Sequence, residues 1–88
     1  MILKIEKSFD KDFKKAKQTN LNKKLLAILK EISSARKISD ISNIKKLRGT
    51  SDLYRIRLGD YRIGLIKEKN NLTLIRFLHR KDIYKYFP

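Results

Sequence analysis

The chain has 88 residues, no cysteine, a single histidine and a formal charge of +14, because 23 lysines and arginines face 9 acidic residues. This length predicts one small domain, residues 1–88, and the composition excludes disulfides, thiolate metal sites and multi-histidine metal sites. Such an excess of positive charge predicts a polyanionic partner, namely nucleic acid, a ribosome or an acidic protein. We expect neither a metal nor a cofactor.

No run of the sequence approaches the roughly 18 apolar residues of a membrane span. The N-terminal MILKIEKSF also lacks the apolar region of a signal peptide. We therefore expect a soluble protein of the cytoplasm, with no membrane partner.

The first third of the chain predicts a strand and two helices. Residues 1–7 alternate as a short strand suited to a sheet edge, and Ser8 is placed to cap the helix that follows. Asn20 is placed to cap a second helix, and the short loop between the helices predicts an antiparallel helical hairpin. Both helices carry an apolar stripe at helical spacing: Phe9, Phe13 and Ala16 on the first; Leu21, Leu25, Ile28, Leu29 and Ile32 on the second.

The remainder predicts three strands and a short tail. Residues 33–40 are a polar connection, and Ile41 and Ile44 indicate a short turn that packs on the core. Residues 53–65 then read as a β-hairpin, and 72–79 as a third strand that is apolar on both faces except for Arg76. The order β-α-α-β-β-β predicts an α+β domain, with a helical hairpin on one face of a mainly antiparallel sheet. The other face should stay open.

The hairpin predicts its own register. Two alternating runs flank Gly59-Asp60, and glycine supplies the positive φ that a tight hairpin turn needs. One face should then be core, formed by Tyr54, Ile56, Leu58, Tyr61, Ile63 and Leu65. The predicted cross-strand pairs are Leu58–Tyr61, Arg57–Arg62, Ile56–Ile63 and Arg55–Gly64.

The polar face of this hairpin gathers three arginines, Arg55, Arg57 and Arg62. Like charges directly opposite one another destabilise a sheet, whereas guanidinium groups match the geometry of phosphate. The arrangement indicates an anion site, with Gly64 leaving room for a ligand; the alternative is a solvated basic surface. If the last strand pairs beside 61–67, its end brings Arg80 and one tyrosine of the tail toward these arginines.

Such a cluster suits cleavage of RNA through attack by the RNA's own 2′-hydroxyl, a reaction that requires no metal. The reaction needs a base, cations on the phosphorane and help for the leaving 5′-oxygen. Arginines serve the second need well and the others poorly, so the base would be a tyrosine activated by nearby guanidinium groups, or His79. Tyrosine and arginine can also simply stack on bases, and the tail tyrosines can simply cover the end of the sheet.

The segments KKLRG, DLYRIRLGDYRIGL and FLHRKDIYKYF resemble the RelE/ParE superfamily of toxins. The resemblance covers nearly the whole chain, and the HRKDIY ending favours RelE-like ribonucleases over ParE-like gyrase inhibitors. It implies the toxin of a type II toxin–antitoxin system, an mRNA interferase that cuts the codon in the ribosomal A site. It also implies a RelB-like antitoxin that wraps the toxin, and binding to operator DNA only through the antitoxin complex.

The resemblance assigns roles residue by residue. Arg57, Arg62, Arg80 and a C-terminal tyrosine, Tyr84 or Tyr86, would be catalytic. RNA-binding residues would be Lys45, Lys46, Arg48, Arg55, His79 and Lys81. Well-known members carry lysines where Arg55 and Arg57 stand, so two further functions stay open: a ParE-like inhibitor of DNA gyrase, and a catalytically degenerate homologue that binds only RNA or its antitoxin.

Overall fold

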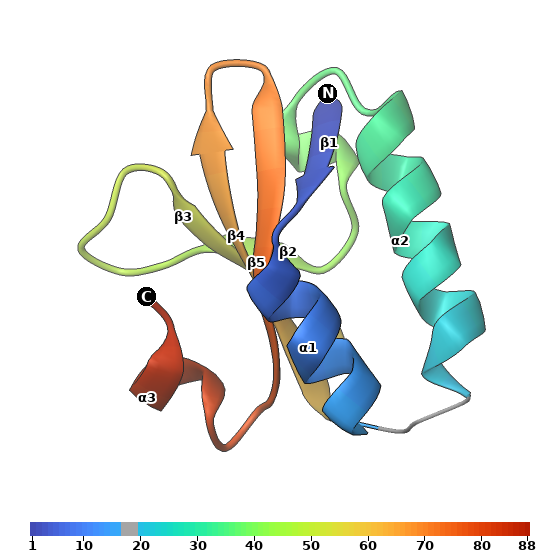
Figure 1. The fold of residues 1–88 in the computed structure, drawn as a ribbon. Coiled ribbons are helices and arrows are strands. Elements are labelled where there is room, and N and C mark those ends of the chain that lie inside the picture. The colour runs from blue at the N-terminus through green and yellow to red at the C-terminus, as the bar shows by residue number, and fades with distance from the viewer. Residues whose placement is uncertain (17–19) are drawn as a thin grey trace.

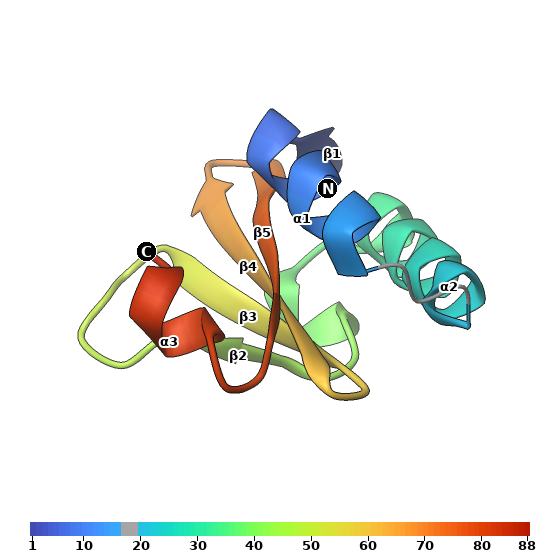
Figure 2. The same ribbon diagram turned by 60° about the horizontal axis from the view of Figure 1, so that its bottom comes forward.

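The computed structural model describes residues 1–16 and 20–88, and shows a five-stranded sheet with two helices on one face (Figures 1 and 2). The strand order is β1-β5-β4-β3-β2; β1 pairs with β5 in parallel and the other pairs are antiparallel. This confirms the α+β class. The elements are β1 (Ile2–Ile5), α1 (Lys7–Ala16), α2 (Leu21–Ser34), a 3₁₀ helix (Ile38–Asp40), β2 (Ile44–Lys46), β3 (Leu53–Leu58), β4 (Tyr61–Glu68), β5 (Asn71–His79) and α3 (Ile83–Tyr86).

The two longer helices run in opposite directions (Figure 1) and bury the predicted apolar stripes in one core with the sheet. Phe9 of α1 stacks edge-on against Phe77 of β5, and α2 contributes Leu25 and Ile32. The short loop predicted between the helices lies outside the described residues. Within residues 1–16 and 20–88, no helix is long and apolar enough to cross a membrane.

The predicted cap of α1 is wrong, and the predicted cap of α2 is right in its position but makes no side-chain hydrogen bond. Helix α1 begins at Lys7, so Ser8 lies inside it, and the Ser8 hydroxyl donates to the carbonyl of Ile75 on β5. Asn20 stands at the N-cap position of α2, but its backbone is already helical and its side chain makes no capping hydrogen bond. The polar side chain of Ser8 serves a long-range contact that local sequence does not encode.

The structure adds three elements to the predicted order. The first is the 3₁₀ helix Ile38–Asp40, in the segment that we expected to be only a polar connection. Ile44–Lys46 forms edge strand β2, which pairs antiparallel with β3, where we expected only a turn. Ile41 is buried as predicted. The tail folds into a single helical turn, α3.

Strand β5 contains a register shift relative to β4, which explains why its sequence reads as apolar on both faces. Leu65 of β4 faces Leu74, whereas the preceding Gly64 faces Arg76, so Ile75 is an extra residue on β5. A bulge of this kind reverses which side chains face the core. Leu74 before the bulge and Phe77 after it therefore both enter the main core.

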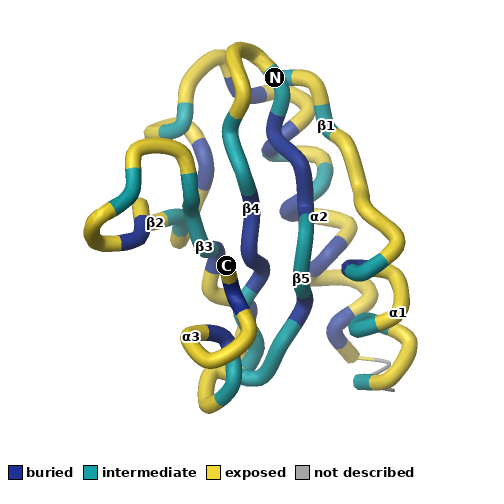
Figure 3. Tube along the Cα trace, turned by 60° about the vertical axis from the view of Figure 1, so that its left-hand side comes forward, coloured by how far each residue is buried: buried dark blue, intermediate teal, exposed yellow. Residues whose placement is uncertain are grey.

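The second face of the sheet is partly covered, contrary to our expectation of an open face. Helix α3 lies on the side of the sheet opposite α1 and α2 (Figure 2) and in front of the strands in Figure 3. A smaller core forms there around Leu47, Ile83 and Phe87. Phe87 occupies the space over Gly64, so the room that we predicted for a ligand at this glycine is filled.

Candidate functional site

The hairpin β3–β4 has the predicted register. Arg57 faces Arg62, Arg55 faces Gly64, and Gly59 in the turn has a φ of +61°. On the opposite side, Ile56, Ile63 and Leu65 are fully buried, so one face is core and the other carries the arginines. Burial of the apolar set fixes the arginines on the outer face, because a slip of one residue would exchange the two faces.

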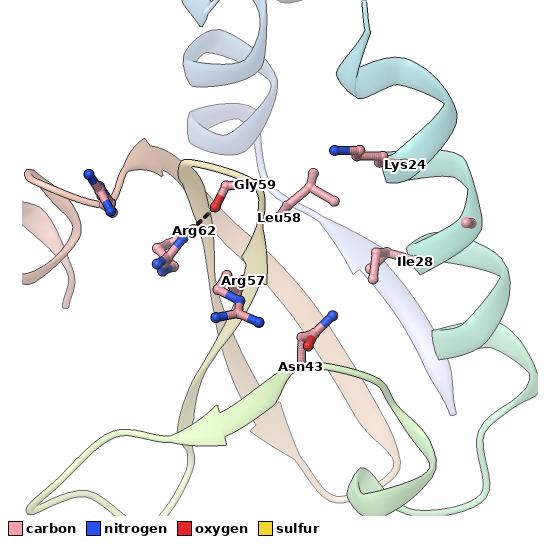
Figure 4. Close-up of a pocket in the computed structure, with 9 residues that line it drawn as sticks. Lys24, Ile28, Asn43, Arg57, Leu58, Gly59 and Arg62 are labelled. Atoms are coloured by element: carbon pink, nitrogen blue, oxygen red, sulfur yellow. Dashed lines mark hydrogen bonds between the residues drawn. The ribbon is translucent and has the colours of Figure 1, made fainter.

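Arg62 lies at the centre of the basic face. Its Nη1 donates to the carbonyl oxygens of Gly59 and Tyr61, at 2.9 Å each, which orients the guanidinium over the turn (Figure 4). Partial burial, followed by the positive charges of Arg55 and Arg57, lowers the pKa of Arg62 from its ordinary value; Arg80 acts in the same direction. The site therefore holds positive charges that repel one another, and an anion bound among them would relieve the repulsion.

These cations line a hollow of about 570 Å³ between α2 and the hairpin turn that joins β3 to β4 (Figure 4). Arg57, Arg62 and Arg80 line one side of it, and the backbone N–H of Arg80 donates to the carbonyl of Asp60 at 2.8 Å. This bond ties the start of the tail to the hairpin turn. Ile28 and Leu58 give the hollow an apolar lining, and none of the described residues that line it is a carboxylate.

Sequence reasoning missed two residues of this hollow. Lys24 reaches it from α2, with its ammonium 4.0 Å from where a Cβ on Gly59 would stand, and Asn43 reaches it from the loop before β2. Asn43 has a φ of +61°, which is uncommon outside glycine. Lys24 is one of several lysines on the polar side of α2, so nothing in the sequence distinguished it.

The two candidate tyrosines of α3 lie in different surroundings. Tyr84 is close enough to the arginines for its charge to raise the pKa of Arg62, and its side chain is 67% exposed. Tyr86 instead lines an apolar groove with Ile75 and Phe87. This electrostatic effect on Arg62 groups Tyr84, and not Tyr86, with the arginines.

His79 lies on the other face of the sheet. It faces Tyr61 across β4, with ring centroids 5.5 Å apart and the rings edge to face. Its Nδ1 accepts a hydrogen bond from the backbone N–H of Lys81 at 3.2 Å. The structure does not bring His79 into the arginine hollow, and its surroundings match a strand-end histidine with a backbone contact.

The remaining predicted RNA-binding residues are exposed and spread around the cluster. Lys45 faces Arg55 across β2–β3 and, with Arg57, lines a second hollow of about 240 Å³, so it extends the basic face. Lys46 faces Tyr54 and therefore points to the opposite side. Arg48 lies in the loop after β2, and Lys81 follows β5.

The described part of the chain contains no group of three or more histidine, cysteine or acidic residues able to hold a metal ion. What the cluster offers is a set of fixed hydrogen-bond donors with positive charge, which suits binding a phosphate and stabilising charge that develops on it. Fold and site together define a small, basic α+β protein with a cluster of arginines on one face of its sheet.

Comparisons with known proteins agree with this class. A family profile described as the ParE toxin of type II toxin–antitoxin systems matches residues 3–84. The chain is 39% identical over 83 residues to Toxin RelE3 of Methanocaldococcus jannaschii, covering 93% of each chain. The chain therefore belongs to the RelE/ParE superfamily, as the toxin of a type II toxin–antitoxin system.

Solved structures give the same answer for the fold. The structure matches the RelB–RelE antitoxin–toxin complex from Methanococcus jannaschii with a TM-score of 0.81 and 35% identity, over 97% of this chain and 99% of that chain. It matches the YoeB dimer from Staphylococcus aureus with a TM-score of 0.70, over 90% of this chain and 95% of that chain. At 17% identity the second match supports the fold alone.

Proposed function

We propose that the protein is a metal-independent endoribonuclease that cleaves mRNA in the ribosomal A site by attack of the RNA's own 2′-hydroxyl. The observation that carries this proposal is the convergence of Arg57, Arg62 and Arg80 on one hollow. Tyr84 acts on Arg62 through its charge, and no carboxylate is among the described residues of the lining. Similarity to Toxin RelE3 supports an mRNA interferase.

In the proposed reaction the 2′-oxygen bonds to the adjacent phosphorus and the bond to the 5′-oxygen breaks. Arg57, Arg62 and Arg80 hold the phosphate and the negative charge that grows on it, which is the task such donors perform best. Arg80 also donates a hydrogen bond to the leaving 5′-oxygen, which takes its proton from water, and the RNA upstream of the cut ends in a 2′,3′-cyclic phosphate. Deprotonated Tyr84 accepts the 2′-hydroxyl proton; a tyrosine that only stacks on a base would leave that step to solvent.

Further cations extend the binding surface. Lys24 takes a phosphate on the α2 side of the hollow, Arg55 and Lys45 take one on the β2 side, and Lys46, Arg48 and Lys81 add long-range attraction. Such contacts fix the RNA and make binding depend on salt. Tyr86 and His79 are outside the reacting centre in this proposal.

We propose an acidic, RelB-like antitoxin as the protein partner. The similar toxin from Methanococcus jannaschii was solved as a complex of antitoxin and toxin, and a formal charge of +14 favours an acidic partner. Operator DNA would be bound only through that complex. Messenger RNA and ribosomes place the activity in the cytoplasm, and residues 1–88 act as one domain.

The test uses purified translating ribosomes with a defined mRNA. We expect new 3′ ends confined to the A-site codon, lost with Arg80→Ala, and absent from a control sample of EDTA-treated naked RNA. Cuts on naked RNA would support the nuclease activity but contradict its dependence on the ribosome. The absence of new RNA ends in both samples would contradict the proposed nuclease activity.

A second candidate follows from the ParE description of the matching family profile. As a ParE-like inhibitor the protein would block DNA gyrase, with the arginines contacting protein or DNA and no RNA bond cut. A supercoiling assay with purified gyrase separates the two functions: inhibition without RNA cleavage would favour this candidate. A protein inactive in both assays would be a degenerate homologue that binds only RNA or its antitoxin.

A further inference from the structure

Gly64, in the middle of β4, lies directly under the ring of Phe87. A Cβ at position 64 would stand 2.7 Å from Cγ of Phe87 and 2.8 Å from both Cδ atoms. Ordinary contact between carbon atoms needs about 4 Å, so the ring can sit at this depth only over a glycine. Both residues are buried, with Phe87 only 4% exposed.

Phe87 ends a segment too short to hold itself in place. Helix α3 is four residues long, and an isolated turn of helix is unstable in water. Backbone bonds fix its start, where the N–H of Asp82 donates to the carbonyl of His79 at 2.8 Å. Its end is fixed by the Phe87 N–H, which donates to the carbonyl of Ile83 at 2.8 Å, and by burial of the Ile83 and Phe87 side chains.

Tyr84 lies between these two anchors and contributes little to them. Its side chain is 67% exposed, whereas Ile83 beside it is fully buried. The place of its hydroxyl relative to Arg62 is therefore set by how Ile83 and Phe87 sit on the sheet. The position of Phe87 is set in turn by the missing side chain of Gly64.

We propose that Phe87 on Gly64 is the device that positions Tyr84 against the arginine cluster, so that both are positioning residues of the nuclease. The inference rests on the proposed function and identifies what aligns its base. A methyl group at position 64 would push the ring outward by about 1 Å to reach ordinary contact. A displacement of that size in a reacting group can cost about 100-fold in rate.

The test compares Gly64→Ala with the double variant Gly64→Ala/Phe87→Leu. Gly64 has no positive φ, so alanine fits the strand, and circular dichroism and thermal unfolding verify the fold. We expect Gly64→Ala to lower the single-turnover cleavage rate by about 100-fold with an unchanged Kd for RNA, because the arginines stay in place. The smaller leucine leaves room for the new methyl group, so the double variant should recover most of the rate. Phe87→Leu alone is the control that measures the effect of the smaller side chain without the new methyl group.

Three results would overturn the inference: a Gly64→Ala rate equal to that of the starting protein, a loss confined to the Kd, or a double variant no faster than Gly64→Ala. A second readout does not depend on cleavage. In NMR spectra of Gly64→Ala, the Tyr84 ring signals should move and the Phe87 amide should exchange faster with solvent. In the double variant, the ring shifts and the exchange rate should return to the values of the starting protein. A protein that cuts no RNA refutes the proposed function, while this readout still decides whether Gly64 and Phe87 hold Tyr84.

Discussion

Arginines on neighbouring strands of this sheet meet opposite environments. Arg76 on β5 forms an ion pair with Asp12 of α1, with Nε 2.6 Å from Oδ2, and the same carboxylate accepts the N–H of Phe77 at 3.0 Å. On the described residues, no carboxylate forms an ion pair with Arg57 or Arg62 of the hairpin. One arginine is neutralised within the fold, and the others present their charge to solvent.

The pKa values respond in opposite directions. The hydrogen bond that Arg76 donates to Asp12, together with the negative charge of Asp12, raises the pKa of Arg76. Partial burial and then the charges of Arg55 and Arg57 lower the pKa of Arg62. A charge satisfied by its own fold stabilises the fold, whereas repelling charges without a counter-ion weaken it and gain from a bound anion. The comparison therefore separates a structural arginine from a group that fits a phosphate.

The largest effect should come from Tyr84, the tyrosine whose charge acts on Arg62. Tyr84→Phe removes the phenolate oxygen that accepts the 2′-hydroxyl proton in the proposed reaction, and loss of a general base lowers rates by about 10²–10⁴-fold. Tyr86→Phe is the matched control on the same helical turn, and should leave the rate unchanged because Tyr86 lines the apolar groove. Single-turnover cleavage on translating ribosomes measures both. Equal losses in the two variants would contradict the assignment to Tyr84.

Arg62→Ala should lower the cleavage rate by about 10²–10³-fold, the usual cost of removing one donor to a developing oxyanion. The fold should persist, because removing Arg62 also removes its repulsion with Arg55 and Arg57. Arg36→Ala removes an exposed arginine that does not line the hollow, and provides the control. A folded Arg62→Ala protein with full activity and full toxicity would show that the basic face is not the site.

Lys24→Ala should change binding and leave the chemical step intact. Each phosphate neutralised on single-stranded nucleic acid contributes about 0.7 to the slope of log K against log salt concentration. We expect Lys24→Ala to reduce that slope by about this amount. Lys30→Ala is the control, because Lys30 lies on α2 beside a different hollow. The measurement is RNA binding titrated over salt concentration; identical slopes in the two variants would remove Lys24 from the RNA path.

Features set by neighbouring residues could be predicted from the sequence. The alternation around Gly59-Asp60 gave the hairpin register and hence the arginine pair Arg57–Arg62, and helical spacing gave the stripes on α1 and α2. Both patterns carry a period that burial enforces. The position of Arg80 followed from pairing the last strand beside β4.

Features set by distant contacts could not be predicted. β2 has three residues, too few to show alternation, and Ser8 looked like a cap although its hydroxyl bonds to Ile75. The space over Gly64 looked free because Phe87 comes 23 positions later in the sequence. Only the folded tail brings the two residues together. The same folded tail gives Tyr84 and Tyr86 their different surroundings.

Asp12→Asn should have the smallest effect on cleavage and a clear effect on stability. The asparagine keeps the size of the side chain but loses the charge that pairs with Arg76 and one oxygen that accepts a hydrogen bond. Hydrogen bonds to charged groups contribute about 1.5–3 kcal/mol, so we expect the free energy of unfolding to fall by up to about that amount in urea titrations. Asp10→Asn on the same helix is exposed and serves as the control. The cleavage rate of folded Asp12→Asn should be unchanged, because Arg76 does not line the arginine hollow. A loss of cleavage without a loss of stability would mean that Arg76 belongs to the functional group, and the distinction between the two kinds of arginine would fail.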